Sequence, residues 1–83
     1  MGLAPQQERE LTFGEKAVGL TFNPGNNDLV TKLKTQYAET IDDLQRLREA
    51  NPDPEVKRLA SVAITEAQTA QMWAVKAATW VTK

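Results

Sequence analysis

The chain contains neither cysteine nor histidine. Without cysteine it forms no disulfide and performs no thiol chemistry. Without histidine it lacks the usual zinc and di-iron ligand sets and every Ser-His or Cys-His nucleophile system. We therefore expect no catalytic site, no metal and no cofactor, and a hydrolytic enzyme is the least favoured class of function.

Long apolar runs and a strong charge imbalance are also missing. The longest apolar runs span only a few residues, so we expect no membrane-spanning segment. The start of the chain, Met1 to Pro5, lacks a basic region and a long apolar core, which predicts no signal peptide and a cytoplasmic location. Ten basic and eleven acidic residues give a net charge of −1, which argues against a protein that grips long nucleic acid.

All four glycines lie within the first 25 residues, and none occurs in the rest of the chain. This distribution predicts a loop-rich N-terminal segment, residues 1–26, followed by two helices. Within that segment, residues 11–27 look irregular, because Gly14, Gly19 and the run from Asn23 to Asn27 are turn signals.

The first long helix is predicted over residues 27–50. Asn27 is a suitable N-cap, and Asp28 in the first turn favours the helix dipole. Pro52 ends the helix near Asn51, because the residue before a proline is pushed out of helical geometry. One apolar stripe recurs every three or four positions: Leu29, Val30, Leu33, Tyr37, Ile41, Leu44 and Leu47.

The second long helix is predicted over residues 53–82, with Asp53 as N-cap and Pro54 at the first helical position. The connection between the two helices is short, so they should pair as an antiparallel hairpin. A stripe of alanines along the second helix would let the two backbones approach closely. The sequence thus predicts one all-α domain, residues 1–83.

The second helix carries more apolar surface than one partner helix covers. Trp73 and Trp80 lie two turns apart, and Val62, Met72 and Val75 fall off the face that meets the first helix. A chain of 83 residues buries too little surface to cover them alone. We therefore expect a homo-oligomer with ligand sites where subunits meet.

The N-terminal segment combines aromatic, amide and basic side chains that suit a nucleotide. Phe13 would stack on a base, Asn23 would read a base edge, and Lys16 would meet a phosphate. In the competing interpretation, Phe13 and Phe22 simply pin the segment onto the hairpin. The spacing from Gly14 to Gly19 does not make a phosphate loop, because Leu-Thr follows where Lys-Ser/Thr is needed.

The helices add further candidates. Lys34, together with Lys32, would collect phosphates at a subunit junction, or else lie on a solvated face. Arg58 lies in the first turn of the second helix, where a cation opposes the helix dipole, so it would serve a ligand or a partner carboxylate. Ser61 and Thr65 belong to a polar stripe that would line a cavity, or else be exposed.

Two separate stretches of the sequence resemble the phage anti-CBASS/Thoeris anti-defence hairpin family. The first is LTFGEKAVGLTFN, residues 11–23, followed by Pro-Gly. The second comprises Arg-Leu-Ala-Ser (58–61), Thr-Glu-Ala-Gln-Thr (65–69) and Met-Trp-Ala-Val-Lys-Ala (72–77). The two stretches occur in the expected order, and the resemblance covers residues 11–82.

The resemblance implies a sponge that acts in the host bacterial cytoplasm. Members bind cyclic nucleotide second messengers of bacterial immune systems and withhold them from effectors without cleaving them. A compact oligomer, often a hexamer, is implied, with ligands enclosed between protomers. One branch takes cyclic dinucleotides at dimer junctions and cyclic trinucleotides in a separate pocket, and another takes cyclic ADP-ribose isomers.

The family's ligand-binding residues transfer only in part. Phe13 and Asn23 match an aromatic and an asparagine, ten residues apart, in the ADP-ribose branch. Lys34 matches the lysine of the dinucleotide branch, but no Tyr-Arg pair precedes it and the loop before it is longer. Arg58 matches the arginine of the trinucleotide pocket. These departures leave the choice of ligand class open.

Two other functions remain as alternatives. A structural or adaptor protein would dock a protein partner through the face that carries Trp73 and Trp80. A small DNA-binding regulator is disfavoured by the acidic balance and by the lack of a second basic helix.

Overall fold

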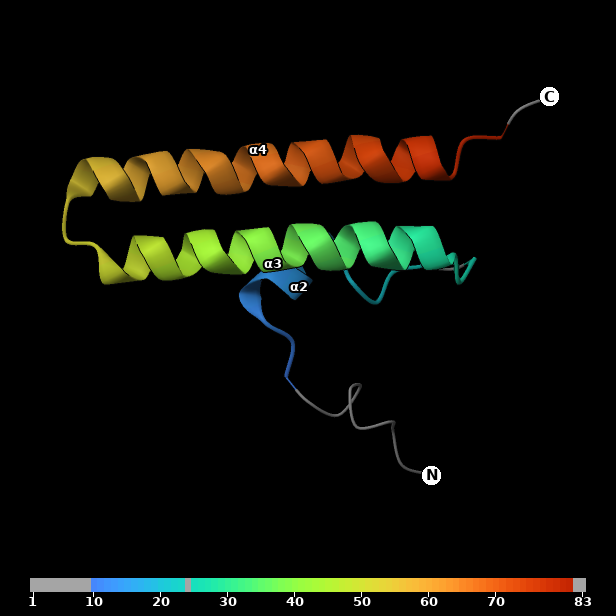
Figure 1. Ribbon diagram of the computed structural model, residues 1–83, viewed down its shortest axis with the longest axis horizontal. Coiled ribbons are helices and arrows are strands. Elements are labelled where there is room, and N and C mark those ends of the chain that lie inside the picture. Colours follow the sequence, from blue (N-terminus) through green and yellow to red (C-terminus); the bar gives the residue numbers. More distant parts are fainter. Residues whose placement is uncertain (1–9, 24, 82–83) are drawn as a thin grey trace.

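The computed structural model describes residues 10–23 and 25–81. Within these ranges it contains three helices and no strand: α2 (Phe13–Val18), α3 (Asp28–Ala50) and α4 (Pro54–Ala78) (Figure 1). The all-α class predicted from the sequence is confirmed. No helix in the described part of the chain is long and apolar enough to cross a membrane.

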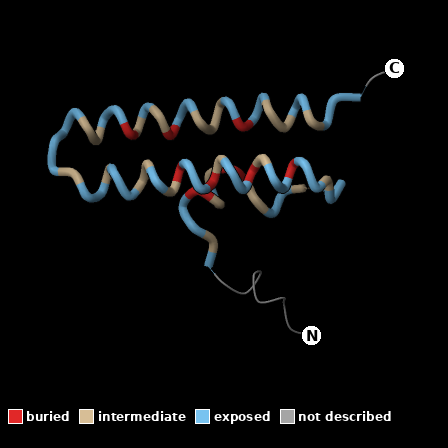
Figure 2. Tube along the Cα trace, viewed as in Figure 1, coloured by how far each residue is buried: buried red, intermediate tan, exposed pale blue. Residues whose placement is uncertain are grey.

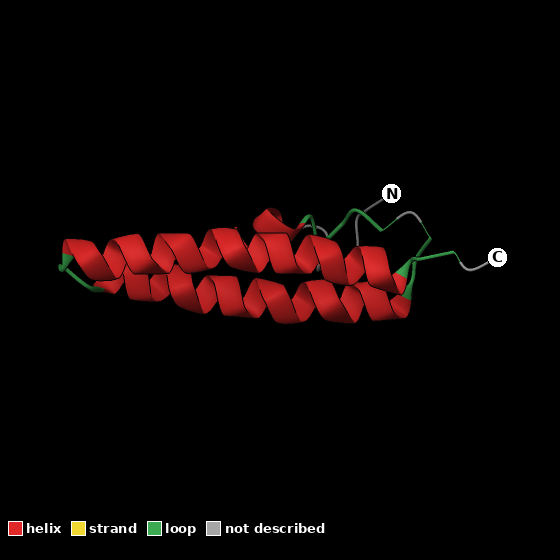
Figure 3. Ribbon diagram, turned by 90° about the horizontal axis from the view of Figure 1, so that it is seen from above, coloured by secondary structure: helices red, strands yellow, loops and turns green. Residues whose placement is uncertain are grey.

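Helices α3 and α4 lie side by side as an antiparallel hairpin, seen from two directions in Figures 1 and 3. The predicted caps are present. Asn27 Oδ1 accepts hydrogen bonds from the amides of Leu29 and Val30, and Asp53 Oδ1 accepts one from the amide of Glu55. Helix α4 ends at Ala78, so the predicted span of 53–82 was too long at its C-terminal end.

Helix α2 corrects the expectation that residues 11–27 are irregular. Thr12 and Glu15 form a reciprocal capping box at its start, which satisfies backbone donors at both positions. Gly19 ends the helix in the left-handed conformation with φ of 62°, which glycine adopts without steric cost. The capping box and Gly19 are both local signals, and the helix between them has only six residues.

Gly14 allows α2 to touch the backbone of α3. A Cβ at this position would lie 2.1 Å from the carbonyl oxygen of Ala38 and 2.9 Å from Asp42 Oδ1. The Gly14 amide donates a 2.7 Å hydrogen bond to that same Asp42 oxygen. Helix α2 is therefore held against the middle of α3 by a contact that only glycine permits.

The core is small and lies between the three helices. Its buried members are Val18, Ala38, Ile41 and Ile64. Figure 2 shows buried positions on the sides of α3 and α4 that face each other, with exposed positions along the outer sides. The molecule measures only 12 Å along its shortest axis, so it is essentially one layer of helices. Met72, Trp73 and Trp80 on the outer surface are 62%, 64% and 68% exposed.

Candidate functional site

Lys34 is the most unusual side chain in the structure. It is only 4% exposed, and its ammonium donates to the carbonyl oxygens of Gly19 at 2.9 Å and Phe22 at 2.5 Å. The same ammonium lies 5.5 Å from the centre of the Phe22 ring. Burial lowers the pKa of Lys34 because desolvation disfavours the charged form. Its partners in the described chain are neutral carbonyls and a ring, and none is a carboxylate.

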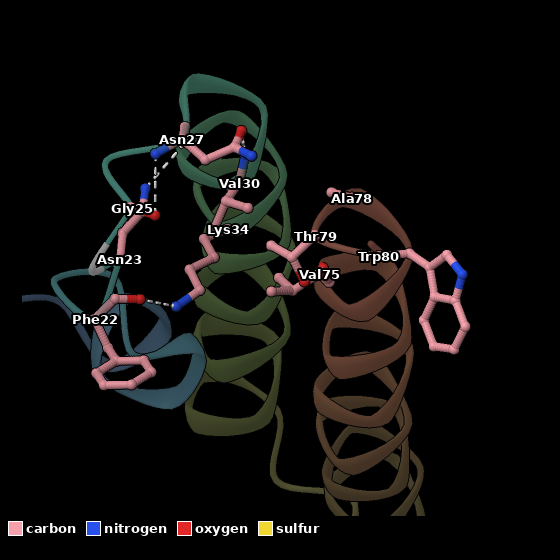
Figure 4. A pocket seen from close by; sticks show the side chains of 10 residues that line it. All are labelled: Phe22, Asn23, Gly25, Asn27, Val30, Lys34, Val75, Ala78, Thr79 and Trp80. Carbon is pink, nitrogen blue, oxygen red and sulfur yellow. Dashed lines mark hydrogen bonds between the residues drawn. The ribbon is translucent and has the colours of Figure 1, made fainter. Parts of the chain in front are cut away.

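A first pocket of about 550 Å³ opens beside Lys34, at the end of the hairpin where α3 begins and α4 ends (Figure 4). The loop before α3 forms one wall and the last turn of α4 forms the other. Figure 4 shows the Phe22 carbonyl bonded to Lys34 across this space, whereas the Trp80 ring points away from it. The lining residues are Phe22, Asn23, Gly25, Asn27, Val30, Lys34, Val75, Ala78, Thr79 and Trp80.

Asn23 lines the first pocket, but its amide folds the loop. Its Nδ2 donates to the Asn27 carbonyl at 3.0 Å and to Thr31 Oγ1 at 2.9 Å, while its Oδ1 accepts from the Asn27 amide at 3.1 Å. Asn23 and Lys34, both predicted as site residues, thus line the same pocket. The hydrogen bonds of Asn23 give it a structural role in the loop.

A second pocket of about 490 Å³ shares three lining residues with the first, namely Phe22, Lys34 and Val75. The other lining residues are Lys16, Ala17, Val18, Gly19, Gln71 and Met72. This pocket unites Lys16 with Lys34, and no carboxylate is among its described lining residues. Two cations beside apolar and aromatic surface are suited to a phosphate attached to a base.

Phe13 lies apart from both pockets. Phe13 is the first residue of α2, and its ring lies 5.6 Å from the guanidinium carbon of Arg48 in α3. This contact agrees with the interpretation that Phe13 pins the N-terminal segment onto the hairpin. Within one chain, Phe13 and Asn23 do not line a common pocket, although their spacing had suggested a shared ligand.

The remaining predicted residues line neither pocket. Arg58 pairs with Glu55 through bonds of 3.0 and 2.7 Å at the surface, and this pairing raises the pKa of Arg58 and lowers that of Glu55. Ser61 Oγ accepts a 3.0 Å bond from Arg48. Thr65 is exposed, and its carbonyl accepts a bond from the Thr69 hydroxyl.

Two residues that the sequence did not mark as site candidates are prominent in the structure. Arg48 contacts Phe13 and Ser61, and its carbonyl accepts a 2.7 Å bond from Lys57. Gln71 is a buried amide that lines the second pocket. The polar stripe on the second helix was a signal for Gln71, because it follows Gln68 at helical spacing.

Residues 15–79 match the family model of the Acb2/Tad1 hairpin domain. No curated protein and no solved structure matches the chain. The matched range holds α3, α4 and both lysines of the second pocket, and it begins two residues after Phe13.

Proposed function

The chain belongs to the Acb2/Tad1 hairpin-domain family, as its sequence predicted, and we propose that it is a phage anti-defence protein that sequesters cyclic nucleotide messengers of bacterial immunity. Family membership is the observation that carries this proposal, because the match includes the whole helical hairpin. The protein would act in the host bacterial cytoplasm and release its ligands chemically unchanged.

The two pockets support this proposal on chemical grounds. A small cyclic nucleotide carries two or three phosphate charges, and Lys16 and Lys34 supply two cations beside one cavity. Phe22 and Met72 add aromatic and polarisable surface for a base. Sequestration needs enclosure and preorganised donors rather than a reactive group, which is the kind of chemistry that these residues offer.

An oligomer, which we propose to be a hexamer, would complete the sites. Both pockets lie at the surface of a single layer of helices. Within one chain, Phe13 lies beside Arg48 near the end of α3, whereas Asn23 bonds to Thr31 near the start of α3. Symmetric subunit junctions present each contact twice, which suits cyclic ligands that are themselves nearly symmetric. We propose cyclic dinucleotides beside Lys34 and a separate site for cyclic trinucleotides near Arg58, with cyclic ADP-ribose isomers as the third ligand class.

A capture-and-release assay tests the function. The protein is incubated with cyclic dinucleotides, cyclic trinucleotides and cyclic ADP-ribose isomers and then removed by filtration, and the filtrate is analysed by chromatography. The retained protein is digested, and the released ligand is analysed in the same way. Depletion followed by intact recovery is the expected result. An altered product would indicate an enzyme, and no depletion of any ligand would reject the proposal.

The exposed tryptophans favour a second candidate function. Trp73 and Trp80 are each more than 60% exposed, and tryptophan is enriched at protein interfaces. In an adaptor protein, this face would dock a protein partner and the pockets would stay empty. A protein partner bound in the absence of any response to cyclic nucleotides distinguishes this function from a sponge.

A further inference from the structure

Gln71 is a buried polar side chain whose amide has no hydrogen-bond partner in the described chain. The residue is 5% exposed, on the side of α4 that also buries Ala60 and Ile64. No fully enclosed side-chain nitrogen or oxygen in the described ranges lacks a partner. The polar atoms of Gln71 therefore keep some accessible surface, and the residue lines the second pocket.

The surroundings of Gln71 resemble those of a base-reading group. Lys34 and Lys16 line the same pocket and supply positive charge for a phosphate. Phe22 and Met72 supply surface against which a base can lie. A buried amide beside such groups differs from a solvated glutamine, because burial restricts the conformations that its side chain can adopt.

The chemistry of the amide selects among bases. A glutamine side chain offers one acceptor oxygen and an NH₂ donor, and adenine offers a matching amino donor and ring-nitrogen acceptor on one edge. On the edge that carries N6 and N7 in adenine, hypoxanthine has an oxygen in place of the amino group and so presents two acceptors. The glutamine amide then cannot make two hydrogen bonds to this edge, because its oxygen finds no donor there and only its NH₂ group can bond.

We propose that Gln71 reads the edge of an adenine base in the second pocket, while Lys34 and Lys16 hold the phosphate next to it. This assignment rests on the proposed cyclic nucleotide binding and specifies which base the ligand must contain. It also gives the second pocket a specificity role that is independent of Phe13 and Asn23.

The test compares adenine ligands with their inosine counterparts by calorimetry. The probes are cyclic di-AMP, cyclic tri-AMP and the matching inosine analogues. We expect the unmodified protein to bind its preferred adenine ligand about tenfold or more tightly than the analogue, as a bidentate base contact implies. Gln71→Met has similar length without polar atoms and should bring this ratio close to one.

Two further variants control the experiment. Gln36→Met makes the same replacement at an exposed position of α3 and should keep the preference. Gln71→Glu keeps the side-chain shape but lacks the amide donor and places a negative charge beside two lysines, so it should weaken binding of every probe. Circular dichroism and light scattering establish that each variant keeps its helices and its oligomeric state.

The outcomes separate this inference from the proposed function. If the protein binds adenine ligands and Gln71→Met keeps the full preference, the role of Gln71 is overturned and the sponge function stands. If the unmodified protein prefers inosine ligands, the inference is also overturned. Loss of self-association in Gln71→Met with an unchanged preference would assign Gln71 to a subunit contact. If no cyclic nucleotide binds, both proposals fall.

Discussion

At the scale of single residues, Lys34 should make the stability of the fold depend on pH. Burial holds the pKa of Lys34 below its ordinary value of 10.5. Between the lowered pKa and 10.5, the unfolded chain binds more protons than the folded chain, so the free energy of unfolding should rise with pH across that window. Urea unfolding of the protein and of Lys34→Met, measured from pH 7 upward, tests this. Equal pH slopes for the two proteins would contradict the prediction.

Gly14 permits a second prediction at this scale. A methyl group at position 14 would overlap the Ala38 carbonyl, so Gly14→Ala should lower the free energy of unfolding by about 1–3 kcal/mol, as overpacking does. Gly25→Ala is the matched control, because a Cβ there meets no atom within 4 Å. It should change stability by less than about 0.5 kcal/mol. Thermal or urea unfolding measures both, and equal effects would refute the close contact.

At the scale of elements, Asp42 should matter to α2 more than to the hairpin. Its carboxylate accepts the Gly14 amide, near the start of a helix too short to persist alone. Asp42→Ala should therefore destabilise the protein by about 1 kcal/mol, as the loss of a cap does. Amide hydrogen exchange should accelerate in α2 while α3 and α4 keep their protection. Uniform acceleration across all three helices would show instead that α2 and the hairpin unfold together.

The three helices show where sequence reasoning succeeds and where it stops. Asn27 and Asp53 were identified as caps because a capping signal is local to its helix. Gly14 was taken for a turn signal, because its actual function depends on Ala38, which is distant in the sequence. The end of α4 was misplaced because no glycine or proline follows it, so the sequence carried no strong stop signal.

For the candidate site, the limit of sequence reasoning is geometric. Lys16 and Lys34 were selected for their charge, and they do line one pocket. The spacing of Phe13 and Asn23 in the sequence did not predict that only Asn23 would line a pocket. Lys34 was expected to be solvated or bound to phosphate, and its bonds to two backbone carbonyls were not anticipated. Such a contact depends on where the segment between α2 and α3 folds back onto α3, and the apolar periodicity of the helices does not predict that position.

At the scale of the whole molecule, the uncovered face of α4 predicts self-association. Most domains pack two layers around a core, whereas this chain is 12 Å thick and leaves Trp73 64% exposed beneath Lys76. Trp73→Glu would place a charge in the centre of that face. We expect light scattering at micromolar concentration to show an oligomer for the unmodified protein and smaller species for Trp73→Glu. Gln36→Glu adds the same charge on an exposed part of α3 and should leave the oligomer intact.

Ligand capture by the dissociated Trp73→Glu variant then shows whether one chain carries a complete site or two protomers are needed to form it. If ligands are enclosed between protomers, Trp73→Glu should lose capture although Lys16, Lys34 and Gln71 are all unchanged. If it keeps full capture as a monomer, each chain carries a complete site and enclosure by a partner is unnecessary. A monomeric unmodified protein that still captures its ligand would lead to the same conclusion, because a single layer of helices would then suffice for binding.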